Sequence, residues 1–323
     1  MAERPQIRVL TAQDEPDLPG LEAIQDEADI RHVRDEASLR EGLRDADILV
    51  VTDFRTEMLE RAWPEQRGLD WVHATSAGVD ALMFPALVES DVPVTNARGV
   101  FNRGIAEYVL GAVLMFAKDT LGNLRYQQER QWRHRETELI HGQRVLVVGA
   151  GSIGREVACL LRAAGLHVEG TARQAREDSA FDAVHANDRL PELLNEADFV
   201  VITAPLTEDT EGLFDRAMFQ RMKPSGRLIN VGRGPIVHTD ALVEALEARK
   251  IAGAALDVFE TEPLPADNPL WGMDNVMISA HMAGDFIGWR RALGEQFVEN
   301  FRRWQQGEPL NNQVDKRRGY GMT

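Results

Sequence analysis

A strand, a glycine-rich turn and a helix follow one another near the middle of this chain, and they constrain its fold more than any other feature. The apolar run at residues 145–148 is typical of a strand buried on both faces of a parallel sheet. A G-x-G-x-x-G pattern, here called the fingerprint, occupies residues 149–154. The amphipathic segment 155–164 predicts a helix that ends before Gly165, and segment 166–170 predicts the next strand. This order predicts an α/β protein built on a parallel sheet.

Each glycine of the fingerprint has a physical task. Gly149 permits the tight turn, Gly151 lets a pyrophosphate approach the backbone, and Gly154 lets the helix pack closely on the strand. The start of the helix, with Ser152 and Ile153, then presents unpaired N–H groups and a partial positive charge to the phosphates. A purely structural turn is the alternative, but the surrounding strands and helix favour a dinucleotide site.

Charge and composition argue against several classes of protein. With 36 basic and 52 acidic residues the formal net charge is −16, which disfavours nucleic acid or an anionic membrane as the main partner. The N-terminus lacks the apolar core of a signal peptide, and the longest apolar stretch, 108–117, is too short to span a bilayer, so we expect a cytoplasmic protein. The single cysteine, Cys159, excludes an internal disulfide, and its apolar neighbours predict a core residue. The eight histidines show no paired metal-ligand spacing, so we expect no metal site.

Short apolar runs on both sides of the fingerprint predict further parallel strands. They cover residues 7–10, 30–33, 48–51, 71–74 and, near an edge, 92–95, and then 199–203, 227–231, 254–258 and 276–279. Helical patterns cover 36–44, a long segment 105–124, 239–249 with Thr239 or Asp240 as its cap, and 289–306. The alternation predicts a doubly wound α/β architecture. We expect the polar tail 313–323 to be mobile.

Three residues suited to carbonyl chemistry follow the last three predicted strands. They are Arg233, Glu262 and His281, one after each strand. Ligands of open α/β sheets bind at the carboxyl ends of the strands. A cation for a carboxylate, an imidazole that exchanges protons and a carboxylate that orients it suit the reduction of a 2-keto acid by a nicotinamide. Singly, each would be a surface arginine, a solvated glutamate or a core histidine, but their joint placement favours the functional interpretation.

Several motifs occur in an order that resembles the D-isomer-specific 2-hydroxyacid dehydrogenases, which include glyoxylate/hydroxypyruvate reductases and phosphoglycerate dehydrogenases. The matching stretches are residues 76–80, 106–107, 147–154, 204–210, 228–234, 252–259 and 262–264, followed by His281. The likeness covers nearly the whole chain, and several ordered motifs together are highly specific.

The resemblance implies a role for each strand-end residue. His281 would protonate the keto oxygen, Glu262 would hold its ring and raise its basicity, and Arg233 would bind the substrate carboxylate and polarise the carbonyl. The backbone N–H groups of Ala77 and Gly78, beside Ser76, would take the other carboxylate oxygen. Phe54 and Arg55, which follow the third strand, are our candidates for selecting the substrate side chain. On the cofactor side, Asp257 would bond the nicotinamide carboxamide, and the adenosine side and nearby walls would be lined by Ala204, Pro205, Thr210 and Val231.

The resemblance also implies two doubly wound parallel-sheet domains. A flavodoxin-like substrate domain would comprise residues 1–100 plus 288–323, and a Rossmann dinucleotide-binding domain, residues 101–287, would be inserted in it. A homodimer is expected, because the apolar run 109–117 in the long helix exceeds what one buried face needs. Burial of that run within the monomer is the alternative.

Two departures from the family pattern stand beside the catalytic histidine. Ala280 occupies a position that is commonly proline, and residues 282–286 differ from the usual small, hydroxyl-containing sequence. The resemblance therefore does not predict the shape of the substrate pocket. Within the same family, formate dehydrogenases pair the histidine with glutamine, so Glu262 argues against that activity. A second alternative is an NAD(P)-binding sensor similar to transcriptional corepressors, and turnover of 2-keto acids would distinguish it from an enzyme.

The residues after the second fingerprint strand indicate which nicotinamide cofactor is preferred. NAD-dependent members carry an acid where this chain has Ala172, and Arg173 and Arg176 follow. An arginine can pair with a 2′-phosphate that a carboxylate would repel, so we expect NADP(H) to be preferred, with NAD(H) possible. Glu169 lies within the strand and is the weaker candidate for a ribose ligand. A solvated basic loop is the alternative.

Overall fold

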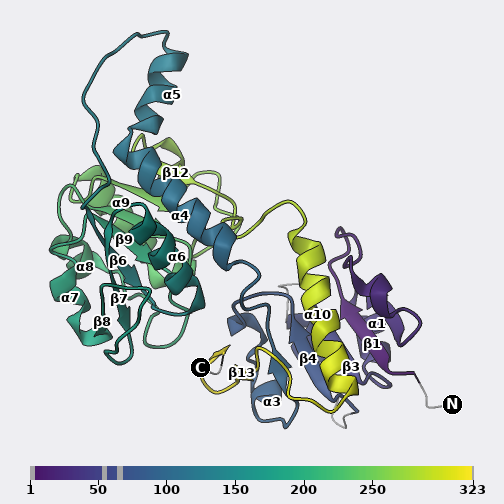
Figure 1. Ribbon diagram of the computed structural model, residues 1–323. Coiled ribbons are helices and arrows are strands. Elements are labelled where there is room, and N and C mark those ends of the chain that lie inside the picture. The colour runs from purple at the N-terminus through teal and green to yellow at the C-terminus, as the bar shows by residue number, and fades with distance from the viewer. Residues whose placement is uncertain (1–3, 53–56, 64–67, 322–323) are drawn as a thin grey trace. The chain divides into compact units, whose positions relative to one another are not determined.

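Two parallel sheets organise the chain in the computed structural model, which describes residues 4–52, 57–63 and 68–321 (Figure 1). The chain divides into two compact units. Unit 1 comprises Met1–Phe101 with Phe286–Thr323, and unit 2 is the continuous segment Asn102–Asp285. The predicted α/β class with parallel sheets is confirmed, because every strand pair within both sheets is parallel. In the described part of the chain, no helix has both the length and the apolar character needed to cross a membrane.

Unit 1 contains a five-stranded sheet in the order β2-β1-β3-β4-β5. Its strands are β1 (Gln6–Leu10), β2 (Asp29–Val33), β3 (Ile48–Val51), β4 (Trp71–Ala74) and the short edge strand β5 (Val94–Thr95). Its helices are α1 (Glu36–Gly42), α2 (Glu57–Ala62), α3 (Pro85–Val88) and α10 (Trp289–Gln305), with short 3₁₀ turns at Leu21–Ile24 and Asp80–Leu82. The central strands β1 and β3 are buried along almost their whole length because both of their faces are covered.

The last helix of the chain completes the core of unit 1. On α10, the fully buried Phe297 stacks on Trp71 of β4, with ring centroids 5.0 Å apart. The Trp71 indole N–H and His73 Nδ1 both lie 2.8 Å from the hydroxyl of Thr95. Burial lowers the pKa of His73 to about 3, so the ring is neutral inside this core.

Unit 2 contains a seven-stranded sheet in the order β12-β11-β10-β9-β6-β7-β8. The strands are β6 (Arg144–Val148), β7 (His167–Ala172), β8 (Ala183–Ala186), β9 (Phe199–Ile202), β10 (Arg227–Asn230), β11 (Gly253–Leu256) and β12 (Val276–Ile278). Strand β8 is not predicted from the sequence, since only Val184 among its four residues is buried and no apolar run marks it.

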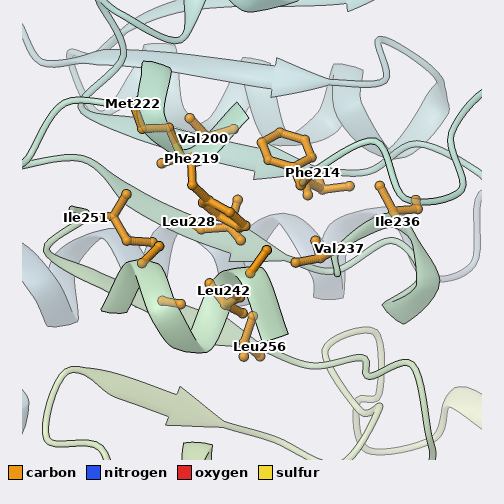
Figure 2. Close-up of a cluster of buried hydrophobic side chains, with 14 of the residues drawn as sticks. Val200, Phe214, Phe219, Met222, Leu228, Ile236, Val237, Leu242, Ile251 and Leu256 are labelled. Atoms are coloured by element: carbon orange, nitrogen blue, oxygen red, sulfur yellow. The ribbon is translucent and has the colours of Figure 1, made fainter. Parts of the chain in front are cut away.

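Helices cover both faces of this sheet. On one face lie α7 (Leu190–Leu193), α8 (Arg216–Arg221) and α9 (Thr239–Glu247), and their apolar residues close over β9, β10 and β11 (Figure 2). Figure 2 shows Phe214 and Phe219 over the sheet, with Leu242 of α9 facing Leu228 of β10. On the other face α6 (Ser152–Ala163) packs against α4 (Asn102–Ala117) (Figure 1).

The predicted long helix 105–124 is wrong, because the structure has two helices there. The first, α4, ends at Ala117, and α5 (Thr120–Gln128) begins after Asp119. Asp119 has a left-handed φ of 47°, and its carboxylate accepts a hydrogen bond from the Gly122 N–H at 3.2 Å. This cap starts a new helix and overrides a continuous helical pattern.

Two further predictions about helices are wrong. Cys159 is exposed, because α6 turns Gly154, Val157, Ala158 and Leu161 inward and Cys159 outward. Neither Thr239 nor Asp240 caps α9, whose cap position is His238. Instead, the carboxylate of Glu260 accepts from the Thr239 N–H at 2.7 Å.

The tail, which we expect to be mobile, contains a short hairpin within the described residues. Strands β13 (Val314–Asp315) and β14 (Tyr320–Gly321) pair as an antiparallel hairpin. The ammonium group of Lys316 donates to the carbonyls of Leu87 at 3.0 Å and Val92 at 3.1 Å. These hydrogen bonds hold the polar tail against the residues around α3, although its composition alone predicts no such contact.

Candidate active site

The topology of unit 2 brings the three strand-end residues to one edge of its sheet. Strands β10, β11 and β12 are adjacent and parallel, so their carboxyl ends lie side by side. Arg233, Glu262 and His281 follow these strands in that order. The fingerprint follows β6, whose carboxyl end lies along the same edge. This is the edge at which open α/β sheets bind ligands.

Glu262 and His281 form a hydrogen-bonded pair. The ring Nδ1 of His281 donates to Oε2 of Glu262 at 2.8 Å, and the backbone N–H of Phe259 donates to the other oxygen at 2.9 Å. Burial raises the pKa of Glu262, but the bonds from His281 and Phe259 and the charges of His281 and Arg233 outweigh it, so the pKa lies below its ordinary value. The carboxylate therefore stays charged and fixes the ring with a proton on Nδ1.

A tight turn directs Arg233 to this pair. The buried amide of Asn230 accepts from the Gly232 N–H at 3.1 Å and donates to the Arg233 carbonyl at 3.2 Å. One guanidinium nitrogen of Arg233 also donates to the Gly232 carbonyl at 2.9 Å. A planar cation held at a strand end, with its charge felt by Glu262, suits a carboxylate ligand.

Gly234 lets the loops after β10 and β11 touch. A Cβ added at Gly234 would overlap the backbone carbonyl of Phe259, so the two backbones lie in direct contact. The contact fixes Arg233 relative to Glu262, which stands three residues beyond Phe259. This role of Gly234 is not predicted from the sequence, although Gly234 belongs to the Gly232-Arg233-Gly234 motif.

Asp257 holds the segment that carries His281. Its side chain is 3% exposed, and its two carboxylate oxygens accept from the N–H groups of Met282 and Ala283, each at 2.9 Å. A third bond to Asp257 comes from the hydroxyl of Ser279 at 2.6 Å. The expected contact with a nicotinamide does not account for these bonds, and this positioning role is not predicted from the sequence.

The fingerprint forms a cradle suited to a pyrophosphate. Gly149 has a φ of 107° and lies so close to Ala204 that an added Cβ would stand 2.6 Å from the Ala204 nitrogen. A Cβ on Gly154 would overlap the Gly149 carbonyl oxygen, whereas one on Gly151 would meet no described atom within 4 Å. Among the residues described, no side chain caps the start of α6, where Ser152 and Ile153 lie. The residues present therefore fit a dinucleotide, with phosphates at the helix N-terminus.

The remaining cofactor candidates line the turn beside the fingerprint. Ala204 is buried and contacts Gly149, and Pro205 beside it is exposed. The Thr210 hydroxyl donates to the Pro205 carbonyl at 2.7 Å and accepts from the Thr207 N–H at 2.8 Å, so it closes the loop. Val231 is buried, and its N–H donates to a carbonyl at the end of β9.

Charged residues surround the carboxyl end of β7. This strand ends at Ala172, directly before Arg173. Arg176 donates to the Ala150 carbonyl at 2.5 Å and lies 3.5 Å from Asp178, a carboxylate that is only 2% exposed. Glu169 lies inside the strand and pairs with Arg144 at 3.3 Å.

The predicted substrate residues of unit 1 follow β4. The hydroxyl of Ser76 donates to the Gly78 carbonyl at 2.6 Å, and the side-chain amide of Asn96 donates to the Ala77 carbonyl at 2.6 Å. Within the described residues, the backbone N–H groups of Ala77 and Gly78 have no hydrogen-bond acceptor. Phe54 and Arg55 lie outside the described residues. No trio of His, Cys, Asp or Glu side chains in the described ranges is arranged to hold a metal ion.

Comparison with known proteins gives matches along the whole chain. A family model described as D-isomer specific 2-hydroxyacid dehydrogenase, NAD binding domain, matches residues 110–283. A glyoxylate reductase of Korarchaeum cryptofilum (strain OPF8) is 31% identical in an alignment 323 positions long, which covers 96% of this chain and 96% of the relative.

Solved structures also match over nearly the full length. A D-isomer specific 2-hydroxyacid dehydrogenase from Xanthobacter autotrophicus Py2, in complex with NADPH and MES, is 33% identical with a TM-score of 0.84, covering 98% of this chain and 100% of that chain. An NADPH-dependent glyoxylate/hydroxypyruvate reductase from Sinorhizobium meliloti, in complex with NADP and sulfate, is 27% identical with a TM-score of 0.83 and the same coverage.

Proposed function

Because the chain belongs to the D-isomer specific 2-hydroxyacid dehydrogenase family, we propose that it reduces small 2-keto acids to D-2-hydroxy acids with NAD(P)H. The hydrogen-bonded pair of His281 and Glu262 beside Arg233 carries this proposal. Glyoxylate and hydroxypyruvate are the proposed substrates, because similar proteins are named as reductases of these acids.

In the proposed reaction each site residue has one task. The nicotinamide, when bound, supplies a hydride to the carbon of the keto group. His281 gives a proton from Nε2 to the keto oxygen, so the carbonyl becomes an alcohol. Glu262 holds the ring through Nδ1 and stabilises its protonated form, and Arg233 binds the carboxylate and draws electron density from the carbonyl. The N–H groups of Ala77 and Gly78 are the proposed ligands of the other carboxylate oxygen.

A turnover assay tests this function against the alternative of a nucleotide sensor. We expect oxidation of NADPH or NADH when glyoxylate, hydroxypyruvate or pyruvate is added to the purified protein. His281→Ala should lower kcat by about 10²–10⁴-fold, because proton transfer is lost, and should leave cofactor affinity nearly unchanged. Cofactor binding without turnover of any acid in the panel would support the sensor. Near-normal kcat in His281→Ala would remove His281 from the mechanism.

For the cofactor, we propose a preference for NADP(H), with NAD(H) as the weaker alternative. Ala172 leaves no carboxylate at the end of β7 to repel a 2′-phosphate, and Arg173 follows directly. Arg173 stands directly at the end of β7 and is the principal proposed phosphate ligand; Arg176, which bonds the Ala150 carbonyl and lies 3.5 Å from Asp178, is the second. The complexes of similar proteins with NADPH and NADP agree with this proposal.

For the oligomeric state, we propose a homodimer formed through an arm of unit 2, residues 118–140. The arm comprises α5 and the segment that returns from it, and it projects from the end of α4 (Figure 1). The return is tied to α4 by the Glu138 N–H, which donates to the Ala117 carbonyl at 2.9 Å. Trp132 is 100% exposed on this arm, and Leu124 and Leu139 are 51% and 76% exposed. A second copy that covers these side chains would remove them from water.

Light scattering tests the dimer. At micromolar concentration the wild-type protein should give twice the mass of one chain, and the double variant Trp132→Glu, Leu139→Glu should give the mass of one. Ile287→Glu is the matched control, because Ile287 is fully exposed outside the arm. A wild-type mass equal to one chain would refute the proposal.

A further inference from the structure

We propose that Tyr108 and Ser279 are positioning residues for His281 and act on it through the buried carboxylate of Asp257. The inference rests on the proposed role of His281 as the proton donor. It concerns a chain of hydrogen bonds that runs from α4 to the segment after β12, wholly within unit 2.

Three consecutive N–H groups converge on Asp257. The N–H of His281 donates to the Asp257 backbone carbonyl at 2.8 Å, and those of Met282 and Ala283 donate to its two carboxylate oxygens. The backbone reaches this arrangement because His281 has a left-handed φ of 50°, which curls the segment around the carboxylate. Such a conformation is unfavourable for a residue with a side chain and persists only where its surroundings enforce it. The orientation of the Asp257 carboxylate therefore decides where the imidazole stands.

Ser279 and Tyr108 set that orientation. The Ser279 hydroxyl has one proton and gives it to the Asp257 carboxylate at 2.6 Å. It must therefore accept from the Tyr108 hydroxyl, whose oxygen lies 2.7 Å away. Burial raises the pKa of Tyr108 to about 12, so the phenol keeps the proton that it donates. The chain thus runs in one direction, from phenol to hydroxyl to carboxylate.

The first turns of α4 support the same segment at a second point. A Cβ on Gly104 would stand 2.7 Å from the Gly284 carbonyl oxygen, so the helix backbone lies directly on the segment. Tyr108 is one turn further along this face of α4. The residue before His281 is Ala280, whose backbone lacks the ring that fixes φ in proline. The Tyr108–Ser279–Asp257 chain supplies an alternative constraint.

Kinetics of hydroxyl-deleted variants test the proposal. Ser279→Ala and Tyr108→Phe should each lower kcat for glyoxylate reduction about ten-fold or less, with the larger loss in Ser279→Ala, because the acid is less well placed. Cofactor dissociation constants measured by fluorescence titration should stay level. The deuterium isotope effect on kcat with 4-deuterated cofactor should rise in both variants, since the chemical step becomes slower. Ser279→Thr, which keeps a hydroxyl, should restore most of the rate.

The double variant and two controls separate positioning from a structural role. Tyr108→Phe should have little further effect when Ser279 is already alanine, because both act through one chain. Tyr126→Phe removes another phenol, which accepts a hydrogen bond from Arg133 at 3.0 Å and takes no part in the Tyr108–Ser279–Asp257 series of hydrogen bonds. This variant should leave kcat and the isotope effect unchanged. Equal kcat and isotope effect in wild type, Ser279→Ala and Tyr108→Phe would overturn the inference, as would a lower rate with an unaltered isotope effect. If His281→Ala keeps its rate, the proposed role of His281 fails instead, and a wild type that turns over no 2-keto acid would refute the proposed function.

Discussion

At the scale of single residues, the charge of Glu262 can be tested by measuring how the reaction rate depends on pH. Its pKa lies below its ordinary value, and the carboxylate is therefore ionised well into the acid range. The ionised carboxylate accepts the hydrogen bond from Nδ1 of the His281 ring, and the proposed mechanism uses this ring in its protonated form.

Glu262→Gln should move the pH–rate profile of 2-keto acid reduction. The amide is neutral, so the protonated ring loses its ionic partner. As pH rises, the variant should therefore lose activity at a lower pH than the wild type does. The profile of kcat/KM between about pH 5 and 9 measures this shift. Glu260→Gln is the matched control, because Glu260 is a nearby carboxylate that bonds the Thr239 N–H. An unchanged profile in Glu262→Gln would contradict the pairing.

Arg173→Ala should raise the KM for NADPH by roughly ten-fold, since a charge-assisted bond to the 2′-phosphate is lost. The KM for NADH should stay roughly level. Steady-state kinetics with both cofactors measure the two constants, and Arg189→Ala, a surface arginine paired with Glu192, serves as the control. Equal or better efficiency of the wild type with NADH would overturn the proposed cofactor preference.

At the scale of elements, the parallel strands were predictable because strands buried on two faces leave continuous apolar runs. The fingerprint was predictable because its glycines stand between a strand and a helix. The break between α4 and α5 was not predictable, because the helical pattern continues across it. One side chain, Asp119, ends the first helix and caps the second. The edge strand β8 was missed for the opposite reason, since it has almost no buried residues.

In the candidate site, the identity of Arg233, Glu262 and His281 was predictable, but the parts that hold them in place were not. The contact of Gly234 with Phe259 and the three N–H groups on Asp257 join segments that are distant in sequence or follow different strands. No local pattern specifies such contacts, because they exist only after the strands have paired.

Gly234→Ala should separate the loops after β10 and β11. The added methyl group would overlap the Phe259 backbone, so we expect a loss of roughly 1–3 kcal/mol in unfolding free energy and a lower kcat. Urea unfolding and turnover measure the two effects. Gly272→Ala is the control, because a Cβ there meets no described atom within 4 Å, and it should be nearly neutral. A Gly234→Ala variant as stable and active as Gly272→Ala would contradict the backbone contact.

At the scale of the whole molecule, His73 should make stability depend on pH. Folded, its pKa is about 3, whereas the ordinary value is 6.5, so only the unfolded chain gains a proton between these values. The contribution of the neutral His73 ring to the free energy of unfolding is complete above pH 6.5. It decreases by about 1.4 kcal/mol per pH unit as pH falls toward 3. Urea unfolding should therefore give a free energy about 2 kcal/mol lower at pH 5 than at pH 7 from this group. His73→Gln should remove that part of the slope, and His134→Gln, at an exposed position, should keep it.

The division of the chain into units also sets an order for its synthesis. Unit 2 is one continuous segment, whereas unit 1 needs α10, which follows every residue of unit 2. On the ribosome, the Rossmann-type sheet can therefore close while the Trp71 face of the first sheet still lacks Phe297 and Phe301. The nascent chain keeps an uncovered apolar sheet face until α10 has been synthesised, which makes unit 1 the part that depends most on chaperones and on an intact α10.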